Sequence, residues 1–345
     1  MPNLIDAPDV LKKIAAYKAD EVAALKARTT IEALREMAAT LPRPRGFEAA
    51  IKSATGPALI CEVKKASPSK GVIREDFDPV AIAKAYEAGG ATCLSVLTDG
   101  PGFQGSNEIF KQVRGTTSLP LLRKDFMLDP IQVAESAAMG ADCVLIIMGM
   151  IDDECAMGLL DEANALGMDA LIETHDQREL ERAIKLRGSM IGINNRDLRT
   201  FNTTLDTFNI LGPHVPRDHT LVAESGIFTA DDIIKLASWN AQGYLVGESL
   251  MRQDKIANAV KKLHPRNYDI VRAHRFSTNH IDQIMNGDSC GCFYCLEEFR
   301  PDSIEEWIFD NTAMCPKCGI DSVISSSCGY EIDKDFLQRM KDYWF

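Results

Sequence analysis

The spacing of apolar residues changes from a helical to a strand-like pattern after residue 53. In residues 7–53, apolar positions such as Val10, Leu11, Ile14 and Ala15 recur at helical intervals. Short, near-continuous apolar runs then alternate with stretches that can be helical, several of which open with Asp and close with Gly. The runs lie at 58–63, 92–97, 119–124, 142–147, 169–173, 190–194, 220–225 and 243–247.

This alternation predicts repeated βα units and a parallel sheet, since near-continuous apolar runs fit strands that are covered on both faces. Eight units over about 200 residues favour a (β/α)₈ (TIM) barrel of the α/β class. The competing fold is a doubly wound open sheet. That fold is less favoured because no G-x-G-x-x-G motif follows the first strand.

The barrel pattern ends near residues 261–269, where Pro265 and mixed polar residues indicate a boundary. Six of the ten cysteines lie within the 39 positions from Cys290 to Cys328. We therefore expect a barrel domain over 1–264, a linker over 265–278 and a small zinc-ribbon-like domain over 279–345.

Four of these cysteines form two C-x-x-C pairs, with nineteen residues between the pairs: Cys292, Cys295, Cys315 and Cys318. Two such pairs can close a tetrahedral Cys₄ site, which would hold a structural zinc ion because no coordination position stays open. Disulfides or free thiols are the alternative interpretation. Cys290 and Cys328 are then spare cysteines or alternative ligands.

Composition narrows the class of protein. The chain is 46% hydrophobic and 26% charged, as is typical of soluble globular proteins, and its net charge of −12 argues against nucleic-acid binding. The N-terminus lacks the apolar core of a signal peptide, and no stretch of 18 or more apolar residues occurs. We expect a cytoplasmic protein that does not interact with a membrane.

Polar side chains follow the predicted strands at their carboxyl ends, where barrels of this kind have their active sites. Glu62 and Lys64 are two residues apart and so point to the same side of an extended chain. Other strands end in further polar residues: Lys124, Glu173, Asn194 and Glu224. Any one of these could simply be a solvated strand end, but the set predicts an acid–base site at one mouth.

The last two strands end in "ESGI" and "VGES", which bring Gly beside Ser. Phosphate sites in such barrels are built there from backbone N–H groups. "SPSKG" after the first strand adds the hydroxyls of Ser67 and Ser69, although Ser-Pro-Ser is also common in ordinary turns. These segments predict a sugar phosphate as the substrate class.

Six segments together resemble the indole-3-glycerol-phosphate synthase family of tryptophan biosynthesis: "CEVKKASPSKGVIREDFDP", "SVLTDGPGFQGS", "LPLLRKDFMLDP", "IGINNRDL", "AESGI" and "GYLVGESLM". The resemblance runs from about residue 5 to 264. It implies a barrel with extra N-terminal helices that fold over the mouth. It also implies a carboxy-lyase, without metal or organic cofactor, that converts 1-(2-carboxyphenylamino)-1-deoxyribulose 5-phosphate to indole-3-glycerol phosphate, carbon dioxide and water.

The resemblance also implies roles for individual residues. Lys124 matches the general acid, Lys64 the partner of the substrate carboxylate, and Glu173 the catalytic glutamate. Glu62 matches an acid that orients the lysines, and the division of proton steps among Glu62, Lys64 and Glu173 stays open. Substrate-binding positions are matched by Asn194, Arg196, Glu224, Ser225, Phe103, Phe126 and Leu198, although core packing is the alternative for the last three.

The phosphate cradle of the family is matched by Ser67, Gly226, Gly247, Glu248 and Ser249. Many relatives carry Ser or Ala at position 248. Because a carboxylate that faced the phosphate would repel it, we expect only the backbone N–H of Glu248 to contribute.

Two other functions are alternatives. One is a non-catalytic barrel scaffold that carries a zinc interaction module, and the other is the isomerase one step earlier in the pathway, which would use an Asp pair. The presence of every catalytic position favours the synthase. The resemblance does not cover the C-terminal domain, whose 8 Lys and Arg against 14 Asp and Glu from residue 265 on give −6, so contact with a protein partner or self-association is expected there.

Overall fold

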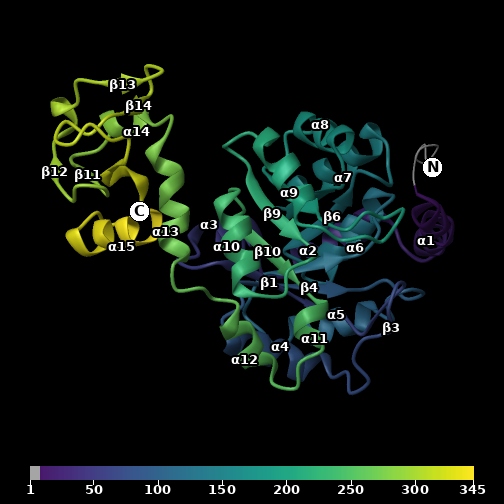
Figure 1. Ribbon diagram of the computed structural model, residues 1–345. Coiled ribbons are helices and arrows are strands. Elements are labelled where there is room, and N and C mark those ends of the chain that lie inside the picture. Colours follow the sequence, from purple (N-terminus) through teal and green to yellow (C-terminus); the bar gives the residue numbers. More distant parts are fainter. Residues whose placement is uncertain (1–7) are drawn as a thin grey trace. The chain divides into compact units, whose positions relative to one another are not determined.

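The structure is a computed structural model that describes residues 8–345. These residues form two compact units, which divide between His264 and Pro265 and are described separately below (Figure 1).

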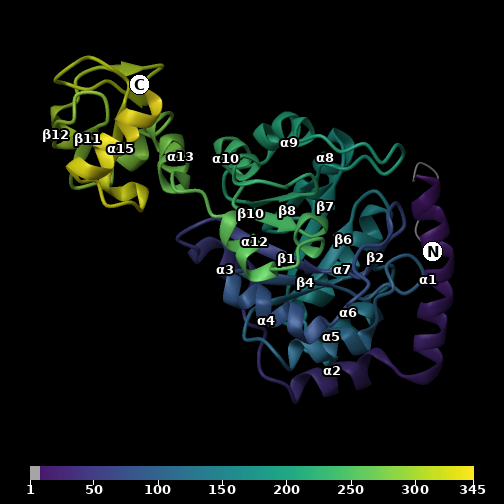
Figure 2. The ribbon, with the colours of Figure 1, turned by 60° about the horizontal axis from the view of Figure 1, so that its bottom comes forward.

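The first unit is built around a closed barrel of parallel strands, in the order β1-β10-β9-β8-β7-β6-β5-β4 (Figures 1 and 2). The strands are β1 (Ala58–Val63), β4 (Cys93–Leu97), β5 (Leu121–Lys124), β6 (Cys143–Ile147), β7 (Asp169–Thr174), β8 (Met190–Asn194), β9 (Thr220–Glu224) and β10 (Gly243–Val246). Their side chains are almost all buried, as expected for strands with a packed interior and a cover of helices. The predicted (β/α)₈ barrel is confirmed.

Helices follow the strands and form the outer ring: α4 (Pro79–Gly89), α5 (Asn107–Arg114), α6 (Pro130–Ala138), α7 (Asp153–Ala165), α8 (Gln177–Lys185), α9 (Asp206–Leu211), α10 (Ala230–Ser238), α11 (Glu248–Met251) and α12 (Ile256–Lys262). A side-chain N-cap starts most of them, for example Asp78 on α4, Asp129 on α6 and Asp176 on α8. Such caps satisfy the free backbone N–H groups of the first turn and so fix where each βα loop ends. In the loop after β1, β2 (Ala66–Ser67) pairs with β3 (Gly71–Val72).

Three further helices precede the barrel: α1 (Asp9–Arg28), α2 (Ile31–Ala39) and α3 (Phe47–Ser53). Only α1 lies at the mouth, where it contributes pocket-lining residues. Helix α2 packs on α6 instead. Helix α3 closes the opposite end, where Glu48 accepts hydrogen bonds from Ser189 and Thr220 at the starts of β8 and β9. The expectation that the N-terminal helices fold over the mouth is therefore correct for α1 and wrong for α2 and α3.

The second unit has its own core. Its strands are β11 (Cys290–Cys292), β12 (Glu298–Phe299) and β15 (Val323–Ser325), which form an antiparallel sheet, and β13 (Trp307–Ile308) and β14 (Thr312–Ala313), which form a hairpin. Its helices are α13 (Tyr268–His274), α14 (Ile281–Met285) and α15 (Lys334–Trp344), with short 3₁₀ turns at Arg275–Ser277, Pro301–Ser303 and Ser326–Cys328.

Residues 265–278, expected as a linker, belong largely to this second unit. They contain α13, whose Ile270 and Ala273 are fully buried against Phe336 and Leu337 of α15. The Pro and the polar residues at 261–269 mark the boundary, but the apolar face of α13 is too short to be recognised from its spacing alone. Within residues 8–345, no helix is both long and apolar enough to cross a membrane.

Candidate active site

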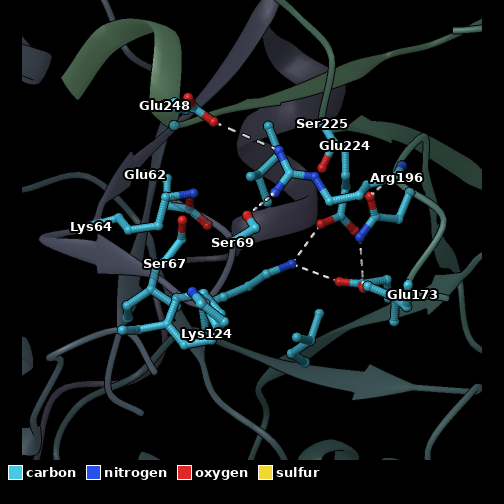
Figure 3. A pocket seen from close by; sticks show the side chains of 18 of the residues that line it. Glu62, Lys64, Ser67, Ser69, Lys124, Glu173, Arg196, Glu224, Ser225 and Glu248 are labelled. Atoms are coloured by element: carbon cyan, nitrogen blue, oxygen red, sulfur yellow. Dashed lines mark hydrogen bonds and ion pairs between the residues drawn. The ribbon is translucent and has the colours of Figure 1, made fainter. Parts of the chain in front are cut away.

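One cavity at the carboxyl ends of the strands contains all of the barrel residues that the sequence predicted for the site (Figure 3). They come from loops and strand ends that are far apart in the chain. The members are Glu62, Lys64, Ser67, Phe103, Lys124, Phe126, Glu173, Asn194, Arg196, Leu198, Glu224, Ser225, Gly226, Gly247, Glu248 and Ser249.

Lys124 occupies the centre of the polar side of this cavity (Figure 3). Its Nζ donates to Glu173 Oε2 at 2.7 Å and to Glu224 Oε2 at 2.5 Å. Glu224 fits beside Glu173 because position 192 is glycine, where a Cβ would lie 2.4 Å from Glu224 Oε1. That Glu224 oxygen is buried and has no hydrogen-bond partner among the described residues.

The surroundings push the pKa values of these groups in different directions. Burial would raise the pKa of Glu173, but Lys124 and His175 outweigh burial and hold it well below the usual range. Burial and the charge of Glu173 raise the pKa of Glu224 to about 8. Burial would lower the pKa of Lys124, but the surrounding glutamates raise it above its ordinary value. Near neutral pH these shifts favour an ionised Glu173, a protonated Glu224 and a charged Lys124.

Glu62 and Lys64 lie on the same side of the β1 end and pair with each other, as their spacing predicts. Glu62 is buried, and the side chain of Lys64 is 15% exposed. The Lys64 ammonium therefore lies at the cavity, and the buried Glu62 carboxylate balances its charge. In this position the ammonium can bind an anion that enters the cavity.

Asn194 and Arg196 extend the polar wall along β8. Asn194 Nδ2 donates to Glu173 Oε1 at 3.0 Å, while its Oδ1 accepts the Arg196 backbone N–H at 3.0 Å. The Arg196 guanidinium donates to Ser69 Oγ at 3.2 Å and lies 3.7 Å from Glu248 Oε2. Glu248 also accepts from Arg252 at 3.0 Å, so its carboxylate is neutralised by two arginines.

An apolar wall faces these charges. The rings of Phe103 and Phe126 are 6.1 Å apart and tilted at 44°, and Leu198 lies on the same cavity. Two exposed aromatic residues that the sequence analysis did not single out, Phe201 and Phe228, line it as well. Helix α1 contributes three apolar residues to the cavity: Val10, Leu11 and Ile14. Their spacing predicted a helix but no role in the site.

The loops after β1, β9 and β10 form the third side of the cavity. Ser67 is buried, and its hydroxyl has no partner among the described residues. Ser249 differs, because its hydroxyl donates to the Ile227 carbonyl at 2.9 Å. Ser67 is therefore available to a ligand through its side chain, whereas Ser249 is available through its backbone.

The sequence analysis missed His175, which lies one residue beyond β7 and behind Glu173. Its Nε2 is 3.1 Å from Glu173 Oε1, and its Nδ1 is 2.9 Å from Glu179 Oε2. The signal was present, because Glu173 and His175 have the same two-residue spacing as Glu62 and Lys64.

In the second unit the four predicted cysteines converge. The sulfur atoms of Cys292, Cys295, Cys315 and Cys318 all lie within 4.8 Å of one another. The Cys292–Cys318 and Cys295–Cys315 separations are 3.7 Å, far longer than a disulfide bond and close to the ~3.8 Å between ligands of a tetrahedral zinc with Zn–S bonds of about 2.3 Å. Cys290 and Cys328 are free thiols outside this group.

Comparison with known proteins agrees with this geometry. Residues 11–263 match the family model of indole-3-glycerol phosphate synthase. The indole-3-glycerol phosphate synthase of Azospirillum brasilense is 46% identical over 258 residues, which are 74% of this chain and 98% of that protein. Residues beyond 263 lie outside the family match.

Some solved structures also match part of the chain, at low sequence identity. A thiamine phosphate pyrophosphorylase from Pyrococcus furiosus is 17% identical, with a TM-score of 0.47 over 62% of this chain and 96% of its own. A mutant tryptophan synthase α-subunit from the same organism is 15% identical, with a TM-score of 0.47 over 60% and 98%. From the family match and the identity with the Azospirillum protein, the chain belongs to the indole-3-glycerol phosphate synthase family, which acts in tryptophan biosynthesis.

Proposed function

We propose that the cavity catalyses the complete synthase reaction as a carboxy-lyase, with Lys124, Lys64, Glu62 and Glu173 as its catalytic residues. The substrate is 1-(2-carboxyphenylamino)-1-deoxyribulose 5-phosphate. Ring closure, decarboxylation and dehydration convert it to indole-3-glycerol phosphate, carbon dioxide and water in the cytoplasm. The position of Lys124 between two carboxylates, at the centre of a cavity that also has an apolar wall, is the observation that carries the proposal.

Ring closure requires an acid at the ketose oxygen. The ring carbon that bears the carboxylate attacks the sugar C2 carbonyl, whose oxygen gains negative charge. Lys124 is a weak acid in the protein without substrate because its pKa is raised. An alkoxide is more basic than an amine, however, so transfer of the Lys124 proton to it is downhill.

Decarboxylation requires that the substrate carboxylate be held until its carbon–carbon bond breaks. Lys64 is the cation for this step, and Glu62 fixes the ammonium in place through their ion pair. The anthranilate ring lies against Phe103, Phe126 and Leu198, whose low polarity favours loss of the charged carboxylate as neutral carbon dioxide.

Dehydration requires a base and a proton for the departing hydroxyl. Glu173 is ionised and acts as the base, while Glu224 retains a proton near neutral pH and can donate to a substrate hydroxyl. Asn194 and Arg196 orient the sugar, together with Ser225. The phosphate binds the Ser67 hydroxyl and the backbone N–H groups of residues 226 and 247–249.

A lysine substitution tests this assignment. We expect Lys124→Ala to lower kcat for indole-3-glycerol phosphate formation by about 10³-fold, whereas the Kd for substrate changes only severalfold. Turnover is measured from indole fluorescence and binding by calorimetry. The control is Lys111→Ala on the exposed face of α5, which should retain full activity. Wild-type turnover in Lys124→Ala would refute the role of Lys124 as acid.

The Cys₄ group supports a second part of the proposal. The second unit is a separate domain with a structural zinc ion held by Cys292, Cys295, Cys315 and Cys318, and the reaction itself needs no cofactor. Four thiolates complete a tetrahedral shell and leave no position for a substrate.

A further inference from the structure

A buried histidine behind the catalytic carboxylate has no role in the reaction described above. His175 lies in the loop between β7 and α8, and its side chain is 9% exposed. Neither His175 nor Glu179 lines the cavity. The ring nonetheless bridges Glu173, 3.1 Å from Nε2, and Glu179, 2.9 Å from Nδ1.

The protonation state of His175 follows from the groups beside its two ring nitrogens. An ionised carboxylate only accepts hydrogen bonds, so a nitrogen that faces one must carry a proton. Nδ1 of His175 is hydrogen-bonded to Glu179, whereas Nε2 lies 3.1 Å from Glu173 Oε1 without the geometry of a hydrogen bond. Carboxylate oxygens thus lie beside both ring nitrogens, and this arrangement favours the doubly protonated imidazolium form. Burial would lower the pKa of His175, but the neighbouring carboxylates of Glu173 and Glu179 outweigh burial and raise the pKa to about 10.

Glu179 is held in place for this contact. Its Oε2 also accepts the backbone N–H of His175 at 2.8 Å. Its other oxygen packs against Gly149 in the β6–α7 loop, where a Cβ would lie 2.6 Å away. An alanine at position 149 would therefore displace the carboxylate. The backbone at His175 and at Gly149 thus fixes the position of Glu179.

Glu173 accepts hydrogen bonds from two side chains, and His175 adds an ion-pair contact. Oε1 faces His175 Nε2 and accepts from Asn194 at 3.0 Å, and Oε2 accepts from Lys124 at 2.7 Å. The titratable groups that surround Glu173 are thus Lys124 from β5, His175 from its own loop and, on the far side of Lys124, Glu224 from β9. Those that surround His175 are Glu173 and Glu179.

We propose that Glu179 and His175 are positioning residues: Glu179 keeps His175 in the imidazolium form, and the imidazolium orients Glu173 and keeps it ionised as the base of the dehydration. The inference rests on the proposed role of Glu173. It assigns to the β7–α8 loop a function in catalysis although neither residue touches the substrate.

The first test uses Glu179→Gln, which keeps the shape of the side chain and removes its charge. We expect kcat to fall about tenfold while KM changes less than twofold. Because Glu173 then faces a weaker donor, its pKa rises, and the acid limb of the kcat profile moves to higher pH by about one unit. The matched control is Glu181→Gln on the exposed face of the same helix, which should reproduce the wild-type profile.

The second test does not depend on turnover. The chain has 6 histidines, and ¹⁵N-imidazole NMR of the full protein distinguishes imidazolium from neutral rings. One signal should remain imidazolium at pH 8.5, disappear in His175→Gln and become neutral at lower pH in Glu179→Gln. A neutral His175 at pH 8.5, or a Glu179→Gln protein with an unchanged acid limb, would overturn the inference. An active Lys124→Ala protein would instead overturn the proposed function and leave the NMR result standing.

Discussion

At the scale of single residues, Glu173 and Glu224 share one lysine and yet differ in proton affinity. Lys124 contacts both glutamates, but only Glu173 also accepts a hydrogen bond from Asn194 and has His175 Nε2 3.1 Å away. Glu224 has one oxygen without a partner among the described residues. The difference in donors explains why one group is a base and the other holds a proton at the same pH.

This difference predicts how stability depends on pH. A carboxyl group whose pKa is raised on folding binds a proton more tightly in the native state, so its contribution to stability is present below its unfolded pKa and is lost as pH rises. Burial and the charge of Glu173 raise the pKa of Glu224 from 4.5 to about 8. Between about pH 5 and 8, the free energy of unfolding of the wild type should therefore fall by about 3.5 kcal/mol relative to that of Glu224→Gln.

Urea unfolding at several pH values measures this effect. Glu181→Gln serves as the control and should give a curve parallel to the wild type, because its carboxylate is exposed. Parallel curves for Glu224→Gln and the wild type would show that Glu224 ionises normally. We also expect Glu224→Gln to lose activity, so that stability and function change in opposite directions at this position.

The sequence predicted those residues of the site whose position depends only on the strand that carries them. Glu62, Lys64 and Lys124 could be predicted because the two-residue period and the position of strand ends determine where their side chains point. The two-residue spacing of Glu173 and His175 was visible in the sequence, but the role of His175 depends also on Glu179 from the next helix. That second pairing joins different elements and leaves no periodic signal.

At the scale of elements, α1 is fixed to the barrel mouth by a buried ammonium group. Lys18 is 2% exposed, and its Nζ lies 2.7 Å from Asp125 and 2.9 Å from Asp99, in the loops after β5 and β4. Tyr17 donates to the same Asp99 at 2.9 Å. Helical spacing predicted α1, but it could not predict a buried lysine whose partners lie in other loops of the barrel.

Removal of this ion pair should loosen α1 and open the apolar side of the cavity. Lys18→Met removes the cation beside the buried Asp99 and leaves Asp125 with Arg123 alone. Loss of one partner of a buried ion pair costs about 3–5 kcal/mol. Because α1 supplies Leu11 and Ile14 to the cavity, we expect KM to rise about tenfold. Hydrogen exchange in residues 9–28 should accelerate in the same variant.

The control for this experiment is Lys12→Met on the same helix. Lys12 makes only a long, exposed contact of 3.8 Å with Asp9, so its loss should leave KM and hydrogen exchange unchanged. If Lys18→Met retained wild-type protection in α1, the ion pair would not be what holds the helix.

At the scale of the whole molecule, the family match and the catalytic cavity lie within one compact unit. The match ends at residue 263, and the units divide between His264 and Pro265. The clustered cysteines predicted the second unit. Its extent was underestimated because the residues of α13 were interpreted as part of a linker. All of the residues that line the cavity belong to the first unit.

The two units should therefore respond separately to loss of the metal site. A small domain with a modest core depends on its metal for much of its stability. We expect about one equivalent of zinc per chain in the wild type and none in the double variant Cys315→Ser/Cys318→Ser. Its residues 265–345 should become sensitive to protease, while kcat/KM stays within about twofold of the wild type because no cavity residue has changed.

Cys328→Ser is the matched control, since Cys328 is a buried cysteine of the same unit that lies outside the Cys₄ group. It should retain zinc and protease resistance. A wild-type protein without zinc would contradict the metal assignment, whereas a large loss of kcat/KM in the double variant would show that the second unit supports the barrel. The metal assay and the kinetic assay thus separate the role of the cysteines from the role of the domain that they stabilise.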